Sequence, residues 1–470
     1  MVMGSLSQQT DVVVIGGGPG GYVAALRAAD LGKEVIVVEQ RSRRGGVCLL
    51  EGCIPSKTLI HSVEIAEGAR HGKNFGVLCG EVSIDIEALR ANKEKVVTVL
   101  SRGIDQLLKA RGVEVIEARA RFEGPRKLQL SGADVAGIEF RHAIVATGSS
   151  IARLPMMEGL EVWTSREALE VKEIPGSLLV IGGGYIGLEL GFVYAGLGSR
   201  VSVVEMLPSL LTGADKDLVR PVAKSAKSAF EEILLEATVG GIEKADDGGF
   251  KVEIETNGKT LERSFDQVLV AVGRKPNTSD LGLERTGVKI DERGLIIVDD
   301  QCRTAEPSIY AIGDVTAGPM LAHKASRQGK VAAEALAGHN AAFDNRAIPA
   351  VVFTRPEVAW AGLTETQARA EGRPVKVGRF PLAALGRART LGGPDGAFKV
   401  ISDPDSGLLL GVGMVGPHAS ELVAEGALAI EMGATLEDLA ATIHPHPTLS
   451  EGLCEAAEVA MGAAIHITSR

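Results

Sequence analysis

The sequence predicts an α/β protein with two Rossmann-like domains and a smaller α+β domain at its C-terminal end. Three observations indicate this architecture. A strand, a glycine-rich turn, a helix and a second strand occur in residues 11–39 and again in residues 177–205. A buried strand that ends in a turn of small residues also occurs twice, at residues 143–148 and 268–273. Beyond residue 345, short strands and helices follow one another without another glycine-rich turn.

Length and composition indicate a globular protein with several domains. At roughly 150 residues per domain, the 470 residues predict about three domains. Hydrophobic residues make up 45% of the chain and charged residues 23%, and no apolar run reaches the roughly 20 residues needed to cross a bilayer. The net charge of −10 offers no basic surface to a phosphate backbone or an anionic membrane. We therefore expect a soluble protein with neither nucleic acid nor membrane as a partner.

The five cysteines are an odd number in a long chain and do not indicate a framework of structural disulfides. Cys48 and Cys53 are the closely spaced pair, so we expect a disulfide between them to be redox-active. The first ten residues are polar and have neither the apolar core of a secretory signal nor the arginines of a transit peptide. The expected compartment is the cytoplasm.

The first glycine-rich turn follows an apolar strand at residues 11–15 and leads into a helix at residues 22–31. Its three key glycines are Gly16, Gly18 and Gly21. The first allows a tight turn, the second lets a pyrophosphate approach the backbone, and the third lets the helix pack closely on the sheet. The next strand, at residues 34–38, ends at Glu39, where a carboxylate can accept hydrogen bonds from ribose hydroxyls.

The second turn repeats this pattern between a strand at residues 177–180 and a strand at residues 200–204. Its key glycines are Gly182, Gly184 and Gly187. Glu205 follows the last of them by 18 residues, the same interval that separates Gly21 from Glu39. A carboxylate at this place selects against a ribose 2′-phosphate, which favours NAD over NADP. Two alternatives remain: the glycine-rich turns could serve only to pack a helix on a strand, and the two glutamates could be solvated residues at the ends of strands.

Cys48 and Cys53 lie in the sequence Gly-Gly-Val-Cys-Leu-Leu-Glu-Gly-Cys-Ile-Pro-Ser-Lys. Pro55 is well placed as the first residue of a helix, so Cys53 would lie at a helix N-terminus, where the macrodipole favours a thiolate. Lys57 projects from the same face, four residues after Cys53. A disulfide across four residues stabilises little, which favours redox use. Buried free thiols are the alternative, and zinc would need two further ligands.

The remaining elements follow from composition and periodicity. Residues 84–111 predict a long amphipathic helix attached to the first domain. A strand at residues 309–312 delivers Asp314 at its carboxyl end, and a helix follows at about residues 320–336. After a linker at residues 337–345, the third domain should contain four strands and two helices. The strands are expected at residues 351–353, 359–361, 398–402 and 408–415, and the helices at about residues 420–432 and 451–462.

His444 and His446 lie on a proline-stiffened segment that ends at Glu451. A loop fixed by prolines can hold an imidazole in place, and Glu451, at the start of the next helix, can orient His446 through its second ring nitrogen. Such a loop taken alone is more often structural. Beside a dithiol that needs a base, we interpret His446 as that base.

These motifs resemble those of the flavin-dependent pyridine nucleotide–disulfide oxidoreductases, and the resemblance covers nearly the whole chain. Its most specific parts are the dithiol motif at residues 45–57 and the His-Pro-Thr-Leu-Ser-Glu motif at residues 446–451. Residues 311–314 and 319–325 also match the family. The resemblance is strongest to members that oxidise protein-bound dihydrolipoyl groups. It implies FAD and NAD as cofactors, a homodimer, and a lipoyl-bearing carrier protein as a partner.

The resemblance also assigns roles to residues. FAD would be bound by Gly16, Gly18, Gly21, Glu39, Lys57, Gly148 and Asp314. NAD would be bound by Gly182, Gly184, Gly187, Glu205 and Gly273. Lys57 would lie near the isoalloxazine and pair with Glu189, and Asp314 would lie near the ribityl chain. Cys48 would exchange with the substrate and Cys53 would contact the flavin. His446, oriented by Glu451, would act as the base on the dithiol of the other subunit.

The family's organisation implies boundaries for the domains. Residues 1–149 would bind FAD and residues 150–276 would bind NAD. Residues 277–345 would return to complete the FAD domain, and residues 346–470 would form the dimer interface. No metal site is expected.

Two departures from the family pattern concern the substrate. Leu50 and Glu51 replace an asparagine and its neighbour between the cysteines, and the added negative charge could lower the tendency of the dithiol to ionise. Ala384, Leu385 and Gly386, followed by Arg387 and Ala388, lie where the family often has an Asn-Ser-Arg-Ala stretch. Both changes leave open which lipoyl-bearing partner is served.

Three other functions remain open on the sequence. A glutathione-type disulfide reductase would share the dithiol and the base, but such enzymes usually take NADPH, which Glu205 disfavours. A mercuric reductase would need another cysteine pair near the C-terminus, where the sequence has only Cys454. A flavin-bearing scaffold in a multienzyme assembly would not need an intact dithiol and base.

Overall fold

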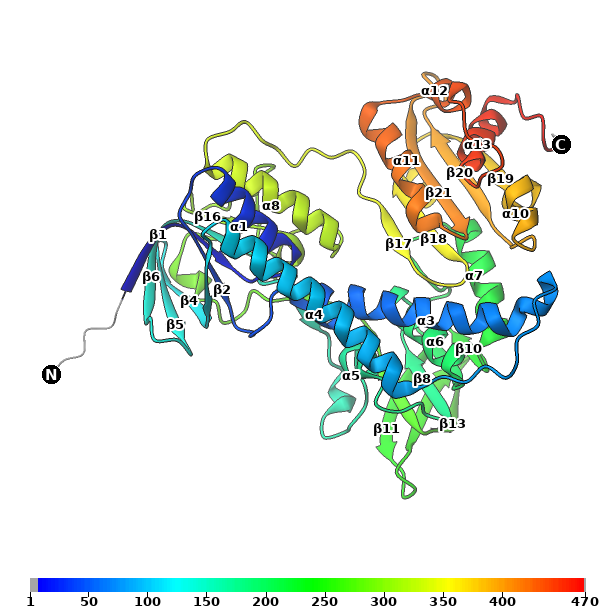
Figure 1. The fold of residues 1–470 in the computed structure, drawn as a ribbon, viewed down its shortest axis with the longest axis horizontal. Coiled ribbons are helices and arrows are strands. Elements are labelled where there is room, and N and C mark those ends of the chain that lie inside the picture. Colours follow the sequence, from blue (N-terminus) through cyan, green and yellow to red (C-terminus); the bar gives the residue numbers. More distant parts are fainter. Residues whose placement is uncertain (1–6, 469–470) are drawn as a thin grey trace. The chain divides into compact units, whose positions relative to one another are not determined.

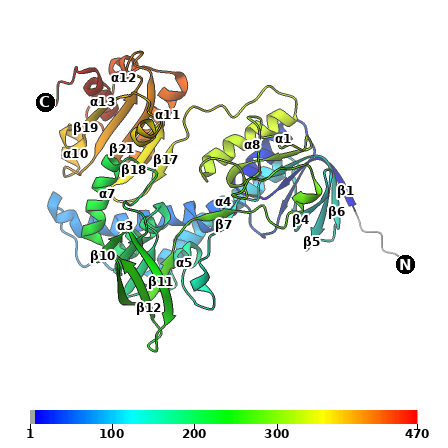
Figure 2. The same cartoon turned by 180° about the vertical axis from the view of Figure 1, so that it is seen from behind.

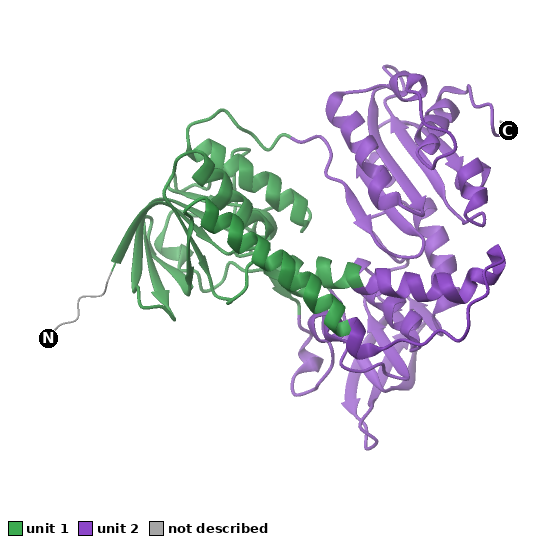
Figure 3. Ribbon diagram, viewed as in Figure 1, with its two compact units in different colours: residues 1–58, 90–152, 273–344 green, residues 59–89, 153–272, 345–470 purple. Residues whose placement is uncertain are grey.

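The computed structural model describes residues 7–468 and divides into two units, shown in different colours in Figure 3. The first unit contains the chain up to residue 58 together with residues 90–152 and 273–344. The second contains residues 59–89, residues 153–272 and the chain from residue 345 onward. Most of the N-terminal segment in which we expect no targeting signal lies outside the described residues.

A seven-stranded sheet forms the centre of the first unit. Its strands are β1 (Ser7–Ile15), β2 (Val35–Glu39), β3 (Glu114–Glu117), β4 (Arg119–Gly124), β5 (Lys127–Ser131), β6 (Gly137–Val145) and β16 (Ile309–Ala311). The order β3-β2-β1-β6 is parallel throughout, and β16 adds to β6 in parallel. β4 and β5 extend β6 as an antiparallel meander. This parallel order with β1 at its centre is typical of Rossmann-like domains.

Helices cover one face of this sheet. In Figure 1, α1 (Pro19–Asp30) and α8 (Ala322–Leu336) lie side by side over the strands, and the part of α4 (Ile86–Ala110) beyond residue 90 packs into the same apolar cluster. Val12 and Val14 of β1 pack with these helices, whereas Val13 packs with the meander on the other face. The two-residue period of a strand explains this alternation.

The second unit repeats the parallel arrangement. Its four-stranded sheet has the order β10-β9-β8-β14 and is parallel throughout. The strands are β8 (Ser177–Ile181), β9 (Arg200–Glu205), β10 (Glu232–Leu235) and β14 (Gln267–Val270). The helices are α5 (Ser165–Glu170), α6 (Tyr185–Leu197) and α7 (Lys216–Ala229). An antiparallel meander of β11 (Ala237–Lys244), β12 (Phe250–Thr256) and β13 (Lys259–Phe265) adjoins the sheet (Figure 2).

The C-terminal part of the second unit is an α+β domain on a five-stranded antiparallel sheet of order β17-β18-β21-β20-β19. The strands are β17 (Ala350–Val352), β18 (Glu357–Gly362), β19 (Lys376–Pro381), β20 (Ala397–Ser402) and β21 (Leu409–Gly416). Five helices accompany them: α9 (Glu365–Ala370), α10 (Gly386–Thr390), α11 (Ala419–Met432), α12 (Leu436–Ala441) and α13 (Glu451–Met461). α11, α12 and α13 share one apolar cluster with this sheet.

The other face of this sheet meets α7. Gly413 of β21 lies so close to α7 that a Cβ atom there would come within 2.5 Å of Leu218 Cδ1. A buried ion cluster strengthens this contact. Lys399 Nζ lies 2.7 Å from Asp215 Oδ2, 3.0 Å from Asp217 Oδ1 and 2.8 Å from Glu365 Oε2. Although burial opposes ionisation, hydrogen bonds led by that from Lys399 lower the pKa of Asp215 to about 2.

The α/β class with two Rossmann-like halves and a C-terminal α+β domain is confirmed, and most predicted elements are found close to their expected bounds. Two helix starts were placed too late, and α1 begins at Pro19 rather than at residue 22. α3 (Cys53–His71) begins two residues before Pro55, because a proline is tolerated throughout the first helical turn, where no N–H has an intrahelical acceptor. The C-terminal domain was expected to have four strands and two helices but has five of each within its described residues, because β19, α9, α10 and α12 were not predicted. Elsewhere the prediction missed α2 (Gly46–Glu51), α5, α7, β3, β10 and the meanders.

The remaining short elements connect the larger ones. β7 (Ser149–Ile151) and β15 (Arg274–Pro276) form a small antiparallel ribbon where the chain leaves and re-enters the first unit. The predicted boundaries at residues 149, 276 and 345 stay a prediction. Within residues 7–468, every helix is too short or too polar to span a membrane.

Candidate active site

Both glycine-rich turns have the same geometry. Gly16 and Gly182 adopt positive φ angles of 108° and 109°, a region that favours glycine. A Cβ atom at Gly182 would come within 2.5 Å of Ala271 O. At Gly21 and Gly187 a Cβ atom would overlap the carbonyl oxygen of the first glycine of the same turn. The first and third glycines are therefore required by the turn and by the close packing of the helix.

The middle glycine of each turn faces open space. A Cβ atom at Gly184 would meet nothing within 4 Å, and one at Gly18 would meet only Gly46 Cα, at 3.8 Å. Gly18 and Gly184 are the N-caps of α1 and α6, whose first N–H groups have no intrahelical acceptor. This leaves room and hydrogen-bond donors for a phosphate at each helix. The residues present therefore fit one dinucleotide at each turn.

Glu39 and Glu205 occupy equivalent positions beside the turns. Glu39 Oε2 accepts a hydrogen bond from Gly17 N at 2.8 Å, and Glu205 Oε2 accepts one from Gly183 N at 2.6 Å. In each carboxylate the other oxygen bonds a backbone N–H two residues further on, at 3.0 and 2.8 Å. Glu39 is only 7% exposed. Each carboxylate is thus held beside its turn, as a ribose ligand would need to be.

The predicted residues at the ends of later strands also lie at turns. Gly148 and Gly273 have φ angles of 69° and 117°, and a Cβ atom at either would meet nothing within 4 Å. Asp314 Oδ2 accepts a 2.5 Å hydrogen bond from Ser149 Oγ, which accepts one from Arg274 Nε at 2.7 Å. Our sequence reasoning missed Ser149 and Arg274. Their position directly after the two predicted glycines is the signal that could have found them.

The two cysteines face each other across the short gap between α2 and α3. Cys48 lies on α2, Cys53 begins α3, and their sulfurs are 2.7 Å apart. This pair lies next to the first phosphate turn: Gly45 N donates to Gly17 O at 2.9 Å, and a Cβ atom at Gly46 would come within 2.7 Å of Gly18 Cα. The loop that carries the two cysteines is therefore anchored directly on the first glycine-rich turn.

Charges around the dithiol act in opposite directions. The hydrogen bond with Cys53 and burial raise the pKa of the half-buried Cys48 thiol, and the ammonium of Lys57 opposes them. Glu51, whose charge we expected to disfavour ionisation, forms an ion pair with Arg41, at 3.1 Å between Oε2 and Nη2. Arg41 Nη1 is buried with no hydrogen-bond partner in the described part of the chain. The structure thus shows the charge of Glu51 paired within the first unit.

Glu189 lies on α6 in the second unit and is buried. Its Oε1 accepts a hydrogen bond from Phe353 N at 3.0 Å, just beyond β17. Lys57 belongs to the first unit, and the pairing of Lys57 with Glu189 stays a prediction.

His446 and Glu451 form the predicted pair within the second unit. His446 Nδ1 lies 2.9 Å from Glu451 Oε1, and Glu451 Oε2 accepts a hydrogen bond from Thr448 N at 2.8 Å. Burial opposes ionisation, but the bonds from His446 and Thr448 lower the pKa of Glu451. An ionised Glu451 accepts the Nδ1 proton, so a neutral His446 carries its lone pair on Nε2. The side chain of His446 is 75% exposed, and a base in this state can take a proton from an external thiol.

His444 holds the loop that carries His446 in place, a role that the sequence did not indicate. Its Nδ1 donates to Thr442 O at 2.9 Å, and its Nε2 lies 2.7 Å from Glu425 Oε1 on α11. Because a carbonyl oxygen only accepts, the contact with Thr442 O requires a proton on Nδ1. The histidine is thereby fixed to two elements, two residues before His446.

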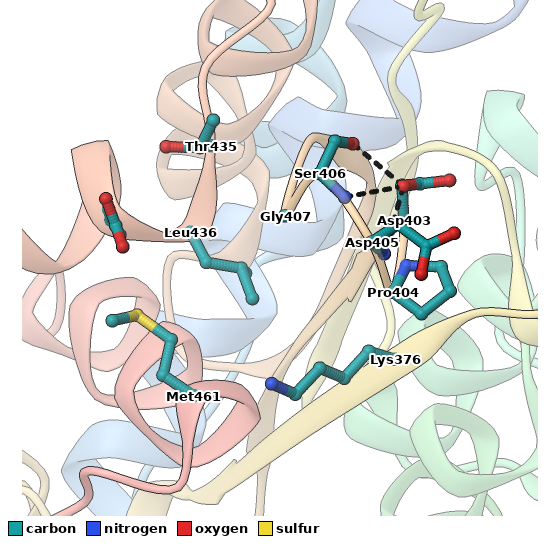
Figure 4. Close-up of a pocket in the computed structure, with 10 residues that line it drawn as sticks. Lys376, Asp403, Pro404, Asp405, Ser406, Gly407, Thr435, Leu436 and Met461 are labelled. Carbon is teal, nitrogen blue, oxygen red and sulfur yellow. Dashed lines mark hydrogen bonds between the residues drawn. The ribbon is translucent and has the colours of Figure 1, made fainter.

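A cavity of about 260 Å³ lies in the C-terminal domain (Figure 4). Lys376, Asp403, Asp405, Glu437 and Met461 are among its lining residues. Asp403 Oδ1 accepts hydrogen bonds from the backbone N–H groups of Asp405 and Ser406 and from the Ser406 hydroxyl. These bonds shape the turn between β20 and β21. The lining includes none of the predicted site residues.

Comparison with known protein families gives two matches. Residues 10–329 match the family described as pyridine nucleotide-disulphide oxidoreductase. Residues 348–457 match the dimerisation domain of the same family. Together the matches cover both parallel sheets and the five-stranded sheet with its helices.

Individual relatives agree with these matches. The chain is 46% identical to dihydrolipoyl dehydrogenase of Geobacillus stearothermophilus over 100% of both chains. It is 48% identical to dihydrolipoyl dehydrogenase of Thermus scotoductus, covering 98% of this chain and 99% of the relative. Among solved structures, the HOCl-induced flavoprotein disulfide reductase RclA from Escherichia coli superposes with a TM-score of 0.84 at 28% identity. That match covers 96% of this chain and 99% of the other.

Proposed function

Because the chain belongs to the pyridine nucleotide-disulphide oxidoreductase family, we propose that it oxidises protein-bound dihydrolipoyl groups and reduces NAD⁺, with FAD as its resident cofactor. The observation that carries this proposal is the pair of cysteine sulfurs 2.7 Å apart, on a loop that is anchored on the first glycine-rich turn. The full-length similarity to dihydrolipoyl dehydrogenases supports the choice of substrate.

The cofactor sites follow from the two turns. The residues that would hold FAD are Gly16, Gly18, Gly21, Glu39, Lys57, Gly148 and Asp314. Those that would hold NAD are Gly182, Gly184, Gly187, Glu205 and Gly273, and Glu189 would lie beside the flavin with Lys57. When bound, FAD supplies a two-electron relay between the dithiol and NAD⁺. We assign residues 1–149 and 277–345 to the FAD domain, 150–276 to the NAD domain and 346–470 to the interface domain.

The dithiol exchanges with the substrate through two displacements. His446 takes the proton of one substrate thiol, and the resulting thiolate attacks Cys48 Sγ in the Cys48–Cys53 disulfide, which releases Cys53 as a thiolate. The second substrate thiol then attacks the first substrate sulfur in the mixed disulfide and displaces Cys48, which takes up its proton and leaves as a thiol. The substrate leaves as a cyclic disulfide and the two cysteines are reduced. In the whole cycle, one dihydrolipoyl group and NAD⁺ give one lipoyl group, NADH and a proton.

Glu51 and Arg41 keep this exchange electrostatically possible. An unpaired carboxylate between the cysteines would disfavour the thiolates that carry the reaction. The ion pair with Arg41 places a cation beside that carboxylate. The chain thereby accommodates an acidic residue in its redox loop.

We infer that the chain works as a homodimer in which His446 serves the dithiol of the second copy. Support comes from the match of residues 348–457 to a dimerisation domain. Within that match, Leu428, Met432 and Ile443 are apolar but exposed, Ile443 to 95%, which favours burial against another chain. Ile443 directly precedes the segment that carries His446. Two-fold symmetry makes the exchange reciprocal.

We also propose a lipoyl-bearing carrier protein as the partner and the cytoplasm as the compartment. The name of the relatives supports a lipoyl substrate. Five cysteines without a disulfide framework support a reducing compartment.

An assay with purified protein tests the function. The protein should be yellow, with about one FAD per chain, and it should reduce lipoamide with NADH far faster than glutathione disulfide with NADPH. Glu205→Ala should raise the KM for NADH and narrow its advantage over NADPH. A folded, colourless protein, or one that prefers glutathione disulfide and NADPH, would contradict the proposal and favour the glutathione-type alternative.

Mixed dimers test the shared site. Cys48→Ser and His446→Ala chains, unfolded and refolded together, should form mixed dimers, each with one site that has both an intact dithiol and an intact base. About a quarter of all sites should then recover activity. Mixed dimers verified by mass that stay as inactive as either parent would show that His446 serves its own chain.

A further inference from the structure

Lys324 on α8 is a buried cation that the mechanism above does not use. It is 2% exposed, and its Nζ donates to Gly313 O at 3.1 Å, Thr316 O at 3.4 Å and Thr316 Oγ1 at 3.3 Å. All three acceptors are uncharged, and burying an ammonium without a contacting carboxylate is costly. Burial lowers the pKa of Lys324 to about 8, while the nearby Asp314 and Cys302 act to raise it.

Gln328 contacts the same turn from the next turn of α8. Its Oε1 accepts a hydrogen bond from Gly313 N at 2.8 Å, and its Nε2 donates to Thr316 Oγ1 at 3.3 Å. Lys324 and Gln328 are four residues apart, so they project from one face of the helix. Between them they bind both the N–H and the carbonyl oxygen of Gly313. We call these two side chains the α8 clamp.

The segment held by the α8 clamp is η4 (Gly313–Val315), which connects β16 to the loop before α8. Gly313 has a φ of 76°, so the turn needs a residue that tolerates the left-handed region. Asp314 is the middle residue of this turn, and its carboxylate is oriented from the other side by Ser149. The α8 clamp therefore fixes the backbone of Asp314, and Ser149 fixes its side chain.

We propose that Lys324 is a positioning residue for FAD, because its ammonium holds the turn that presents Asp314 to the cofactor. This inference rests on the proposed function, since it requires FAD to bind at Asp314. The ammonium has one donor for each of its three acceptors, whereas a neutral amine has only two. Deprotonation at alkaline pH should therefore loosen the turn and speed the release of FAD.

The release of FAD from the intact protein tests the proposal without measuring turnover. After dilution, the rise in fluorescence of released FAD gives the dissociation rate. Lys324→Gln removes the charge but keeps an amide donor, and it should release FAD about tenfold faster or more, as expected for losing hydrogen bonds to a charged group. Lys324→Arg keeps the charge and should release FAD more slowly than Lys324→Gln. Lys330→Met, at an exposed lysine on the same helix, is the control and should behave as the unmodified chain.

The pH profile and a double variant separate positioning from a merely structural role. In the unmodified chain, release should accelerate as the pH rises through about 8, and in Lys324→Gln the rate should not change in that range. Asp314→Asn should also speed release, and adding Lys324→Gln to it should add little, because both changes remove the same contact.

Several outcomes would overturn the inference. Independent, multiplying effects of Lys324→Gln and Asp314→Asn would show that Lys324 does not act through Asp314. If Lys324→Gln lowers the melting temperature of the FAD-free chain but releases FAD as slowly as the Lys330→Met control, Lys324 has a structural role alone. The inference would also be overturned if FAD release from the unmodified chain does not change as the pH rises into the alkaline range, and this measurement does not require a folded variant. Failure of the unmodified chain to bind FAD would instead refute the proposed function.

Discussion

In the second glycine-rich turn, changing Gly187 to alanine should lower stability, whereas changing Gly184 to alanine should weaken the binding of NAD. Gly187→Ala places a methyl group over Gly182 O and 3.1 Å from Val180 Cγ1. A backbone oxygen cannot rotate away, so α6 would have to move from β8. Gly184→Ala places its methyl group in open space, on a backbone with φ −76° and ψ −178° that any residue adopts.

The expected stability losses follow from these geometries. Overpacking against a rigid backbone should cost Gly187→Ala about 3 kcal/mol, the upper part of the usual range. At about 2–4 °C per kcal/mol for a domain of this size, the melting temperature should fall by roughly 6–12 °C. Gly184→Ala loses only the preference of an N-cap for glycine over alanine, which is about 1 kcal/mol or less. The same methyl group, however, fills the space through which a pyrophosphate would reach the N-terminus of α6.

The chain offers a local probe for this comparison. Its two tryptophans, Trp163 and Trp360, both lie in or against the apolar cluster that contains α6, so their fluorescence follows the unfolding of the second unit. We expect Gly184→Ala to melt near the unmodified chain but to raise the KM for NADH by about tenfold or more, with unchanged FAD content. Equal destabilisation by both changes, or an unchanged KM in Gly184→Ala, would refute the distinction between packing glycines and phosphate glycines.

Three further changes test other parts of the structure. Lys399→Met leaves the buried carboxylate of Asp215 without its cation, while Asp217 and Glu365 keep their ion pairs with Arg379, and it should cost about 3 kcal/mol at pH 7. Because the pKa of Asp215 is lowered to about 2 in the folded chain, the difference in stability from the unmodified chain should shrink below about pH 4 as this carboxylate protonates. Cys48→Ser should leave the thiolate of Cys53 beside oxidised flavin and give a long-wavelength absorbance band, but no turnover. Cys53→Ser should show neither the absorbance band nor turnover. Arg41→Ala should raise the pH at which this band appears in reduced protein, and Arg41→Ala with Glu51→Gln should bring that pH back.

Local sequence patterns predicted those parts of the fold whose determinants are close together in the chain. The strand, glycine turn, helix and acidic strand end lie within about one βαβ unit, and the spacing of the glycines alone indicates the kind of turn they form. His446 and Glu451 were predicted for the same reason, since five residues separate them and the prolines fix the loop between. The structure places each of these residues where the pattern predicted its backbone.

Contacts between distant segments could not be predicted in this way. Glu425 and His444 are both ordinary polar residues in the sequence, and only the packing of α11 brings them together. Lys324 looks like one of many helical lysines, and its burial depends on a turn eight to eleven residues earlier. Glu51 was expected to oppose ionisation of the dithiol because the sequence could not show that Arg41, ten residues away, pairs with it.

The two βαβ units remain similar beyond their acidic residues, and this similarity accounts for the position of the dithiol. In the first copy, Gly45 N donates to Gly17 O at 2.9 Å; in the second, Leu211 N donates to Gly183 O at 3.1 Å. Gly45 and Leu211 each follow the acidic residue of their copy by six positions, and both have positive φ angles. The segment after the second strand is thus tied to the phosphate turn in both copies, whatever follows it. In the first copy α2 and Cys48 follow directly, so the position of the dithiol beside the turn is set by a contact that the scaffold already contains.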